Sequence, residues 1–167
     1  PVPPRVTCKS RLYPPYPKPY ATGMAPAMTL WNTILIRSDW HQPDMTGGWP
    51  RVLDLPRALL IAHEMLHVWQ WQHRARTGYT PFKAFGEHFA TADPYLFDPD
   101  TRADLLGFGY EQQGAIVEEY LCCRLLAPRA ERTRRLHEML SRELPLTPLS
   151  TPLAERVLLP WNGVRIE

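Results

Sequence analysis

Residues 59–73 read LLIAHEMLHVWQWQH, an apolar, tryptophan-rich run that carries three histidines and one glutamate. The run has neither Gly nor Pro, and it lies between two helix boundaries. Asp54 and Pro56 are typical of a helix start, and Gly78 is typical of a helix end. The sequence therefore predicts one helix of about 21 residues, roughly 32 Å long, that continues to Gly78.

Within this run, His63, Glu64 and His67 form an HExxH pattern. Because positions i and i+4 lie on nearly the same face of a helix, one turn apart, both imidazoles can bind one Zn²⁺. Glu64 can take a proton from a metal-activated water without binding the metal itself. A chance match is the alternative, but two histidines and a glutamate in an apolar helix are costly to bury without partners. The pattern therefore favours a zinc site with Glu64 as the catalytic base.

His73 matches the spacing of a third histidine ligand in the longer pattern HExxHxxGxxH. That pattern needs a glycine at the position of Gln70, so that the chain can turn and bring the third histidine back. If the helix continues to Gly78, His73 lies about 240° round the helix from His67. We therefore expect His73 to point away from the metal, as a polar residue near the helix end.

A second helix is predicted over about Phe108 to Leu126. Glu111 and Glu118 share one of its faces with Cys122 and with the small residues Gly114 and Ala115. The small residues would let this helix lie close against the first one. The two glutamates are about 10 Å apart along the axis, so only one can reach the metal. The other can hydrogen-bond a ligand histidine, and the spacing leaves this choice open.

The segment AHEMLHVWQ at 62–70, followed by EQQGA at 111–115, resembles the gluzincin clan of zinc metallopeptidases. More narrowly, it is similar to small bacterial HExxH proteins described as Vgr-related, or as peptidase-like partners of injection systems and phage-like particles. In gluzincins a glutamate on a later helix is the third ligand, so the resemblance implies that role for Glu111. An Asp often follows four residues later and orients a ligand histidine. Ala115 stands there in this chain, which makes Glu118 a candidate for that orienting role.

Length and composition limit the classes of function. The chain has 167 residues and a formal net charge of +2, which suits one domain and provides no field for nucleic-acid binding. No apolar run approaches the roughly 20 residues that cross a bilayer. We therefore expect neither nucleic acid nor membrane as a partner. The N-terminus lacks the apolar centre of a secretory signal, which favours the cytoplasm or export by a non-classical route.

The 19 prolines of the chain concentrate at its two ends. Because proline fixes φ and removes a hydrogen-bond donor, both ends should be extended or turn-rich. The sequence thus predicts a proline-rich arm over 1–27, a zinc peptidase-like domain over 28–144 and a second proline-rich arm over 145–167. The arms are either loose tails or segments that wrap the domain or dock on a larger protein assembly. The cysteines are expected to be reduced thiols; they are Cys8, Cys122 and Cys123.

The remaining elements are assigned from local patterns. Ile34 to Ile36 is the best strand candidate, and Val52 to Leu55 adds a short extended piece. A short helix is expected over about Phe82 to Ala90. A third long helix, over about Ala130 to Glu143, carries arginines interleaved with glutamates, which indicates a solvated face with i,i+4 pairs. The fold class is α+β and mostly helical, with a small N-terminal sheet packed on the HExxH helix and the glutamate-bearing helix.

A zinc hydrolase of this kind also needs a donor for the oxyanion. Four side chains could supply it, and the sequence does not choose among them: Tyr79, His88, Tyr95 and Tyr110. Trp69 and Trp71 are interpreted as core packing.

The sequence therefore predicts a zinc-dependent metallopeptidase of gluzincin type, in which Glu64 is the general base. Its substrate would be a peptide or protein that pairs with the strand at Ile34 to Ile36. The alternative is an accessory or structural subunit of a secretion or phage-like particle. Such a subunit would keep a non-catalytic zinc only to tie two helices together.

Overall fold

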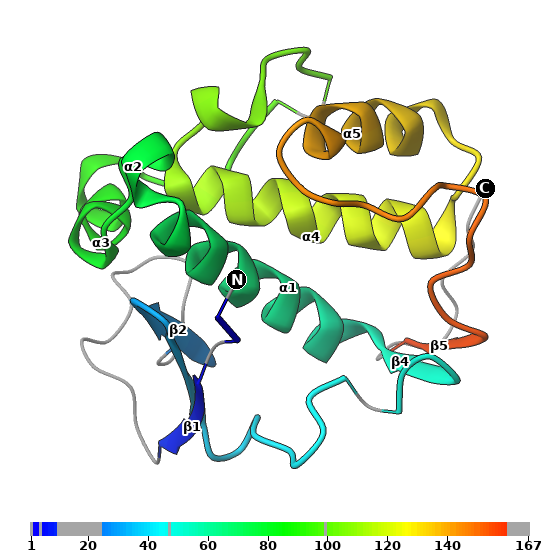
Figure 1. Cartoon of the computed structure of the whole chain (residues 1–167), viewed down its shortest axis with the longest axis horizontal. Helices are drawn as coiled ribbons and strands as arrows, with labels where there is room; N and C mark the ends of the chain where they lie inside the picture. Colours follow the sequence, from blue (N-terminus) through cyan, green and yellow to red (C-terminus); the bar gives the residue numbers. More distant parts are fainter. Residues whose placement is uncertain (1, 4, 10–24, 47, 99, 160–167) are drawn as a thin grey trace.

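The computed structural model describes residues 2–3, 5–9, 25–46, 48–98 and 100–159. The fold is α+β and mostly helical, as predicted (Figure 1). The strands are β1 (Arg5–Lys9), β2 (Ala27–Leu30), β3 (Thr33–Arg37), β4 (Val52–Asp54) and β5 (Arg156–Leu158). The helices are α1 (Leu55–Gln72), α2 (Arg74–Thr77), α3 (Pro81–Ala90), the 3-10 turn η1 (Leu105–Gly107), α4 (Tyr110–Leu126) and α5 (Glu131–Ser141).

Helix α1 begins where the sequence predicts. The carboxylate of Asp54 caps it by accepting a hydrogen bond from the backbone N–H of Arg57, and Pro56 occupies the first turn. The predicted end at Gly78 is wrong for this helix. It stops at Gln72 because His73 leaves the helical conformation, at φ −105° and ψ 25°. The short α2 follows, and Gly78 ends that helix with a φ of 67°.

The three-stranded sheet has the order β1-β3-β2, so β3 is its central strand. β1 runs parallel to β3, and β2 runs antiparallel to it. This order corrects one expectation. The strand at Ile34 to Ile36 was expected to pair with a peptide, but both of its edges already have partners. β1 lies inside the segment 1–27, where the sequence predicts an arm.

Helix α1 lies between the sheet and α4 (Figure 1). On the sheet side, Val68 of α1 packs against the buried side chains of Ala27, Ile34 and Ile36. On the other side, α4 packs against α5 through a second cluster of buried residues. Its members are Leu105, Ile116, Tyr120, Leu136, Met139 and Leu140. α1 and α4 therefore meet in the middle of the molecule, with a core on either side of the pair.

The described part of the C-terminal segment packs on the rest of the chain. β5 pairs in parallel with β4, and the indole N–H of Trp49 donates to the carbonyl of Leu153 at 2.6 Å. The buried guanidinium of Arg124 donates to the carbonyls of Thr147 and Pro148. Residues 145–159 thus wrap the domain, whereas 160–167 lie outside the described residues. Within the described chain, no helix has the length and apolarity that a membrane span requires.

Candidate metal centre

Three buried side chains converge between α1 and α4. His63 and His67 lie one turn apart on α1, and Glu111 lies in the first turn of α4. The two Nε2 atoms are 3.1 Å apart, and His63 Nε2 lies 3.2 Å from Glu111 Oε2. His67 Nε2 lies 3.6 Å from Glu111 Oε1. One ligand atom from each residue falls within 4.8 Å of the others, so the three could hold one metal ion.

Gly114 lets the two helices approach this closely. A Cβ atom at this position would lie 2.3 Å from Cε1 of His63, a distance at which atoms overlap. The imidazole of His63 therefore occupies the space that a side chain at position 114 would fill. The sequence predicted a close approach at Gly114 or Ala115, and the structure assigns it to Gly114.

Glu118 lies behind His63 rather than in the cluster. Its Oε1 atom is 2.6 Å from Nδ1 of His63, on the far side of the ring from Glu111. A carboxylate only accepts hydrogen bonds, so in the neutral ring this contact keeps the proton on Nδ1 and leaves the lone pair on Nε2. Of the two glutamates left open by the sequence, the structure brings Glu111 into the cluster and puts Glu118 against the histidine.

Glu87 of α3 fixes the start of α4. Its carboxylate accepts hydrogen bonds from the backbone N–H groups of Tyr110 and Glu111, at 2.8 and 2.9 Å. These two groups have no acceptor within their own helix, so the carboxylate satisfies them and also interacts favourably with the helix dipole. The next residue of α3, His88, lies with Nε2 3.5 Å from Glu111 Oε1. α3 therefore contacts both the backbone and the carboxylate of Glu111.

Glu64 is buried beside the cluster, and Thr29 of β2 holds its carboxylate. The Thr29 hydroxyl lies 2.6 Å from Glu64 Oε2 and 3.1 Å from the backbone carbonyl of Glu64. Burial raises the pKa of Glu64, although the nearby His67 and His63 oppose that shift. The sequence did not point to Thr29, because its role depends on the packing of β2 against α1.

The charges in the site are strongly coupled. Burial lowers the pKa of His63, but the carboxylates of Glu111 and Glu118 outweigh it and raise that pKa to about 10. Burial likewise raises the pKa of Glu111, but His67, His63 and His88 hold it well below its usual value. The carboxylates therefore stabilise positive charge on the histidines. A metal ion between the two histidines and Glu111 would supply positive charge at the same place.

The residues fit a zinc ion in chemistry and spacing. Tetrahedral zinc with ligands at about 2.0–2.1 Å places its ligand atoms about 3.3–3.4 Å apart. The nitrogen–nitrogen distance of 3.1 Å and the nitrogen–oxygen distances of 3.2 and 3.6 Å bracket that value. Two imidazoles and one carboxylate are also the ligand set of several catalytic zinc sites.

The other candidate residues take different positions. His73 is exposed, and its Nδ1 atom contacts the carbonyl of Trp69 at 2.9 Å, outside the cluster as expected. The predicted core role of Trp69 and Trp71 is wrong, since both are half-buried. The Trp69 ring packs on His73, and the guanidinium of Arg74 lies over the Trp71 ring.

Three of the four candidate oxyanion donors contact a residue of the cluster, and His88 does so through Glu111. The ring of Tyr95 contacts those of His63 and His88, at centroid distances of 5.9 and 5.6 Å. Tyr79 is buried and stacks on His67, and burial raises the pKa of its phenol. The hydroxyl of Tyr110 donates to the carbonyl of Thr77, away from the cluster. The geometry therefore favours His88 and Tyr95 over the other two.

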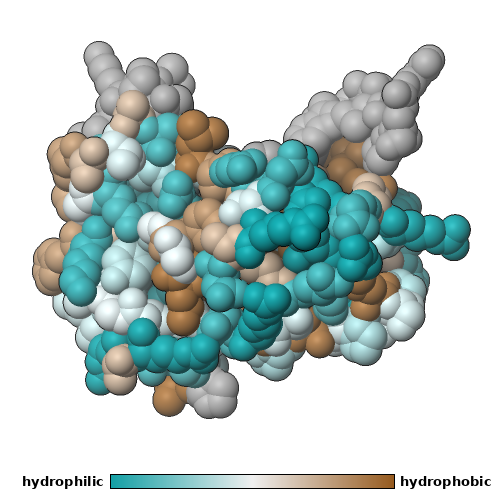
Figure 2. Space-filling view, turned by 90° about the horizontal axis from the view of Figure 1, so that it is seen from above, coloured by the Kyte–Doolittle hydropathy of each residue, from teal (hydrophilic) through white to brown (hydrophobic). Residues whose placement is uncertain are grey.

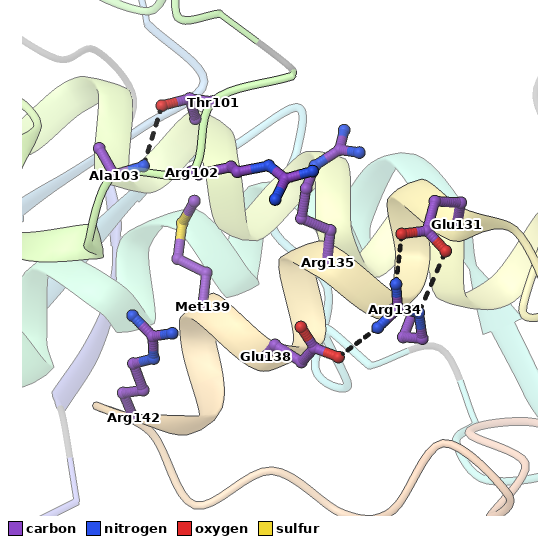
Figure 3. A pocket seen from close by; sticks show the side chains of 9 residues that line it. All are labelled: Thr101, Arg102, Ala103, Glu131, Arg134, Arg135, Glu138, Met139 and Arg142. Atoms are coloured by element: carbon purple, nitrogen blue, oxygen red, sulfur yellow. Dashed lines mark hydrogen bonds and ion pairs between the residues drawn. The ribbon is translucent and has the colours of Figure 1, made fainter.

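A groove between residues 101–103 and α5 is separate from this site (Figure 3). Three of the arginines that line it, Arg134, Arg135 and Arg142, form ion pairs with acids. Arg134 binds Glu131 and Glu138, and Arg135 binds Asp100. Figure 2 shows hydrophilic side chains gathered over this side of the molecule. The predicted i,i+4 pairing on a solvated helix face is confirmed for Arg134 and Glu138, whereas Arg132 and Arg135 pair with acids outside α5.

No known protein family, curated protein sequence or solved structure matches this chain. The geometry of the site therefore carries the functional conclusion.

Proposed function

We propose that the chain is a zinc-dependent hydrolase of the metallopeptidase type. His63, His67 and Glu111 would bind the zinc ion, and Glu64 would be the general base. The observation that supports this proposal is the convergence of two histidine nitrogens and one carboxylate at 3.1–3.6 Å from one another, with a further buried carboxylate beside them. A structural zinc has no use for that second buried carboxylate.

The metal would supply Lewis acidity, which polarises a water molecule and the substrate carbonyl. The chain's own residues prepare the ligands for it. Glu118 holds the proton of His63 on Nδ1, so that the Nε2 lone pair points to the metal position. His88 contacts the carboxylate of Glu111, and Glu87 accepts a hydrogen bond from the backbone N–H of the same residue. Three ligands from the protein leave a fourth position free for water or substrate.

Glu64 would move the protons of the reaction. It would accept a proton from the attacking water and then deliver it to the nitrogen of the leaving amine, which balances the hydrolysis of an amide. The raised pKa of Glu64 brings its proton affinity closer to that needed for both steps. Thr29 holds Oε2, which leaves Oε1 for the water.

Strand β2 supports a peptide as the substrate. The backbone N–H of Arg37 donates to the carbonyl of Pro26, so these two residues form a hydrogen-bonded pair. From there, residues of β2 alternate between non-hydrogen-bonded and hydrogen-bonded pairs with β3. Ala27 and Thr29 then direct their backbone groups away from β3, towards the edge of the sheet. Within the described residues this edge has no strand partner. An extended peptide could bind there by strand addition, beside the residue that holds Glu64.

Replacement of Glu64 by Gln tests the proposal. We expect turnover of casein or peptidoglycan-derived peptides to fall by at least about 100-fold, because the base is lost. Zinc content per chain should stay at one, because Glu64 is not a ligand. Glu138→Gln makes the same chemical change on the exposed face of α5 and should leave both quantities unchanged.

The outcomes separate the candidate functions. Retained activity in Glu64→Gln would refute the catalytic assignment. Stoichiometric zinc without cleavage by the unaltered chain would instead favour an accessory subunit with a structural metal.

A further inference from the structure

Two glutamines without solvent exposure connect His67 to the start of α4. Gln70 and Gln113 are 0% and 2% exposed. The Nδ1 atom of His67 lies 2.8 Å from Gln70 Oε1, and Gln70 Nε2 lies 2.9 Å from Gln113 Oε1. Gln113 Nε2 donates to the carbonyl of Phe108 at 2.9 Å. Because buried amides are costly unless they are hydrogen-bonded, this continuous chain explains how both are accommodated.

The last acceptor sets the direction of every bond in this chain. A backbone carbonyl can only accept, so the atom of Gln113 that faces Phe108 must be its NH₂ group. The oxygen of Gln113 then faces Gln70 and must accept from the NH₂ group there. Gln70 Nε2 also reaches the carbonyl of Tyr110 at 3.4 Å, which requires the same orientation.

The consequence falls on His67. With its oxygen towards the ring, Gln70 can only accept, and Nδ1 of His67 must carry the proton. The lone pair of the neutral imidazole is then on Nε2, which faces His63 and Glu111. Reversal of either amide would place two oxygens against each other in the protein interior. The ring contact with Tyr79 would not by itself select between the two tautomers.

We propose that Gln70 and Gln113 form a tautomer relay, in which the carbonyl of Phe108 fixes His67 with its proton on Nδ1 and its Nε2 lone pair towards the metal. Both glutamines are positioning residues and touch neither metal nor substrate. The inference rests on the proposed function, because it takes the cluster as a metal site. The two ligand histidines thus have different supports, a carboxylate behind His63 and a neutral amide relay behind His67.

The test is zinc affinity, measured by competition with a chromophoric chelator. Gln70→Met keeps the length of the side chain and removes the acceptor, so we expect zinc to bind about 10- to 100-fold more weakly. Gln113→Met should weaken it in the same direction but less, because Gln70 can still donate to Tyr110. The double variant should be no weaker than Gln70→Met, since both act through one contact with His67. The control is Gln72→Met, at the end of α1, whose amide binds Asn32 and the carbonyl of Val2 instead, and it should keep zinc affinity within about two-fold.

Nitrogen NMR of the zinc-loaded, unaltered chain gives a readout that does not depend on the folding of any variant. We expect His67 to show a protonated Nδ1 and a metal-bound Nε2. Metal on Nδ1, or unchanged zinc affinity in Gln70→Met, would overturn the relay and leave the proposed hydrolase intact. A wild-type chain without zinc affinity would overturn both. Retained catalysis in Glu64→Gln, with zinc and the His67 signals as expected, would instead overturn the hydrolase assignment and leave the relay intact.

Discussion

At the scale of the residue, Thr29 shows how a side chain from another element can control the base. Its hydroxyl is the hydrogen-bond partner of Glu64 Oε2, in a site that water does not reach freely. Thr29→Val keeps the shape and removes the hydroxyl. We expect kcat to fall about 10-fold with zinc affinity unchanged, because the carboxylate loses its fixed orientation.

Thr29→Ser should restore most of that activity, since it restores the hydroxyl. Thr133→Val is the matched control. Thr133 is also buried, but its hydroxyl donates to the carbonyl of Ala127, at the C-terminal end of α4. This variant should lose stability and keep its kcat. An equal loss of kcat in both valine variants would contradict a specific role for Thr29.

Gly114 allows a test of the close helix approach. Gly114→Ala introduces a Cβ 2.3 Å from the ring of His63, so the ring or the helix must move. We expect a loss of about 1–3 kcal/mol in stability from overpacking, together with zinc affinity at least about 10-fold weaker. Gly86→Ala serves as the control. It lies in an exposed position of α3, with no atom within 4 Å of the added Cβ, and a helical Ala is favoured there. Zinc affinity in Gly114→Ala equal to that of Gly86→Ala would contradict the assigned role.

The site could be predicted from the sequence wherever local periodicity determines geometry. His63 and His67 share a helix face because they are four residues apart, and Gly114 follows Glu111 by one turn for the same reason. Thr29 and Glu87 could not be predicted in this way. Each reaches the site from a separate element, and no local pattern encodes that contact.

At the scale of the element, the first turn of α4 depends on α3. Glu87 accepts from two backbone N–H groups, and the second belongs to Glu111. Glu87→Gln leaves one acceptor oxygen and no charge. We expect about 1 kcal/mol less stability and weaker zinc binding, because the turn that carries Glu111 frays.

Hydrogen exchange at the amides of Tyr110 and Glu111 measures this effect directly. Both should exchange faster in Glu87→Gln, whereas amides in the middle of α4 should not change. Unchanged protection of these two amides would show that α4 holds its own start. Glu119→Gln, farther along the same helix and paired with Arg132, is the control.

The bounds of α3, α4, α5, β3 and β4 were predicted to within about two residues, whereas the strands β1, β2 and β5 were not predicted. The sequence placed the start of α1 correctly, because Asp54 and Pro56 form a local capping signal. The break at His73 has no such signal, since neither Gly nor Pro lies there. The strand at Ile34 was identified, but its central place was not, because it depends on a partner from residues 5–9.

At the scale of the whole molecule, the candidate metal centre joins two halves. α1 packs against the sheet, α4 packs against α5, and the cluster of His63, His67 and Glu111 lies between these helices. A ligand that binds only the folded state stabilises it by mass action. Zinc at 100 times its dissociation constant should therefore add about 2.7 kcal/mol to the free energy of unfolding.

Thermal unfolding with and without a chelator measures this coupling between metal and fold. We expect the midpoint to fall by several degrees when the metal is removed, and to return when zinc is added. The metal-free chain should still fold, because Glu111 remains paired with the histidines around it. Glu111→Gln weakens the ligand set and should make the midpoint nearly insensitive to zinc, whereas Glu138→Gln should respond as the unaltered chain does. A midpoint that the chelator does not change would mean that no metal joins α1 to α4, and the site would then need another explanation for its two facing histidine nitrogens.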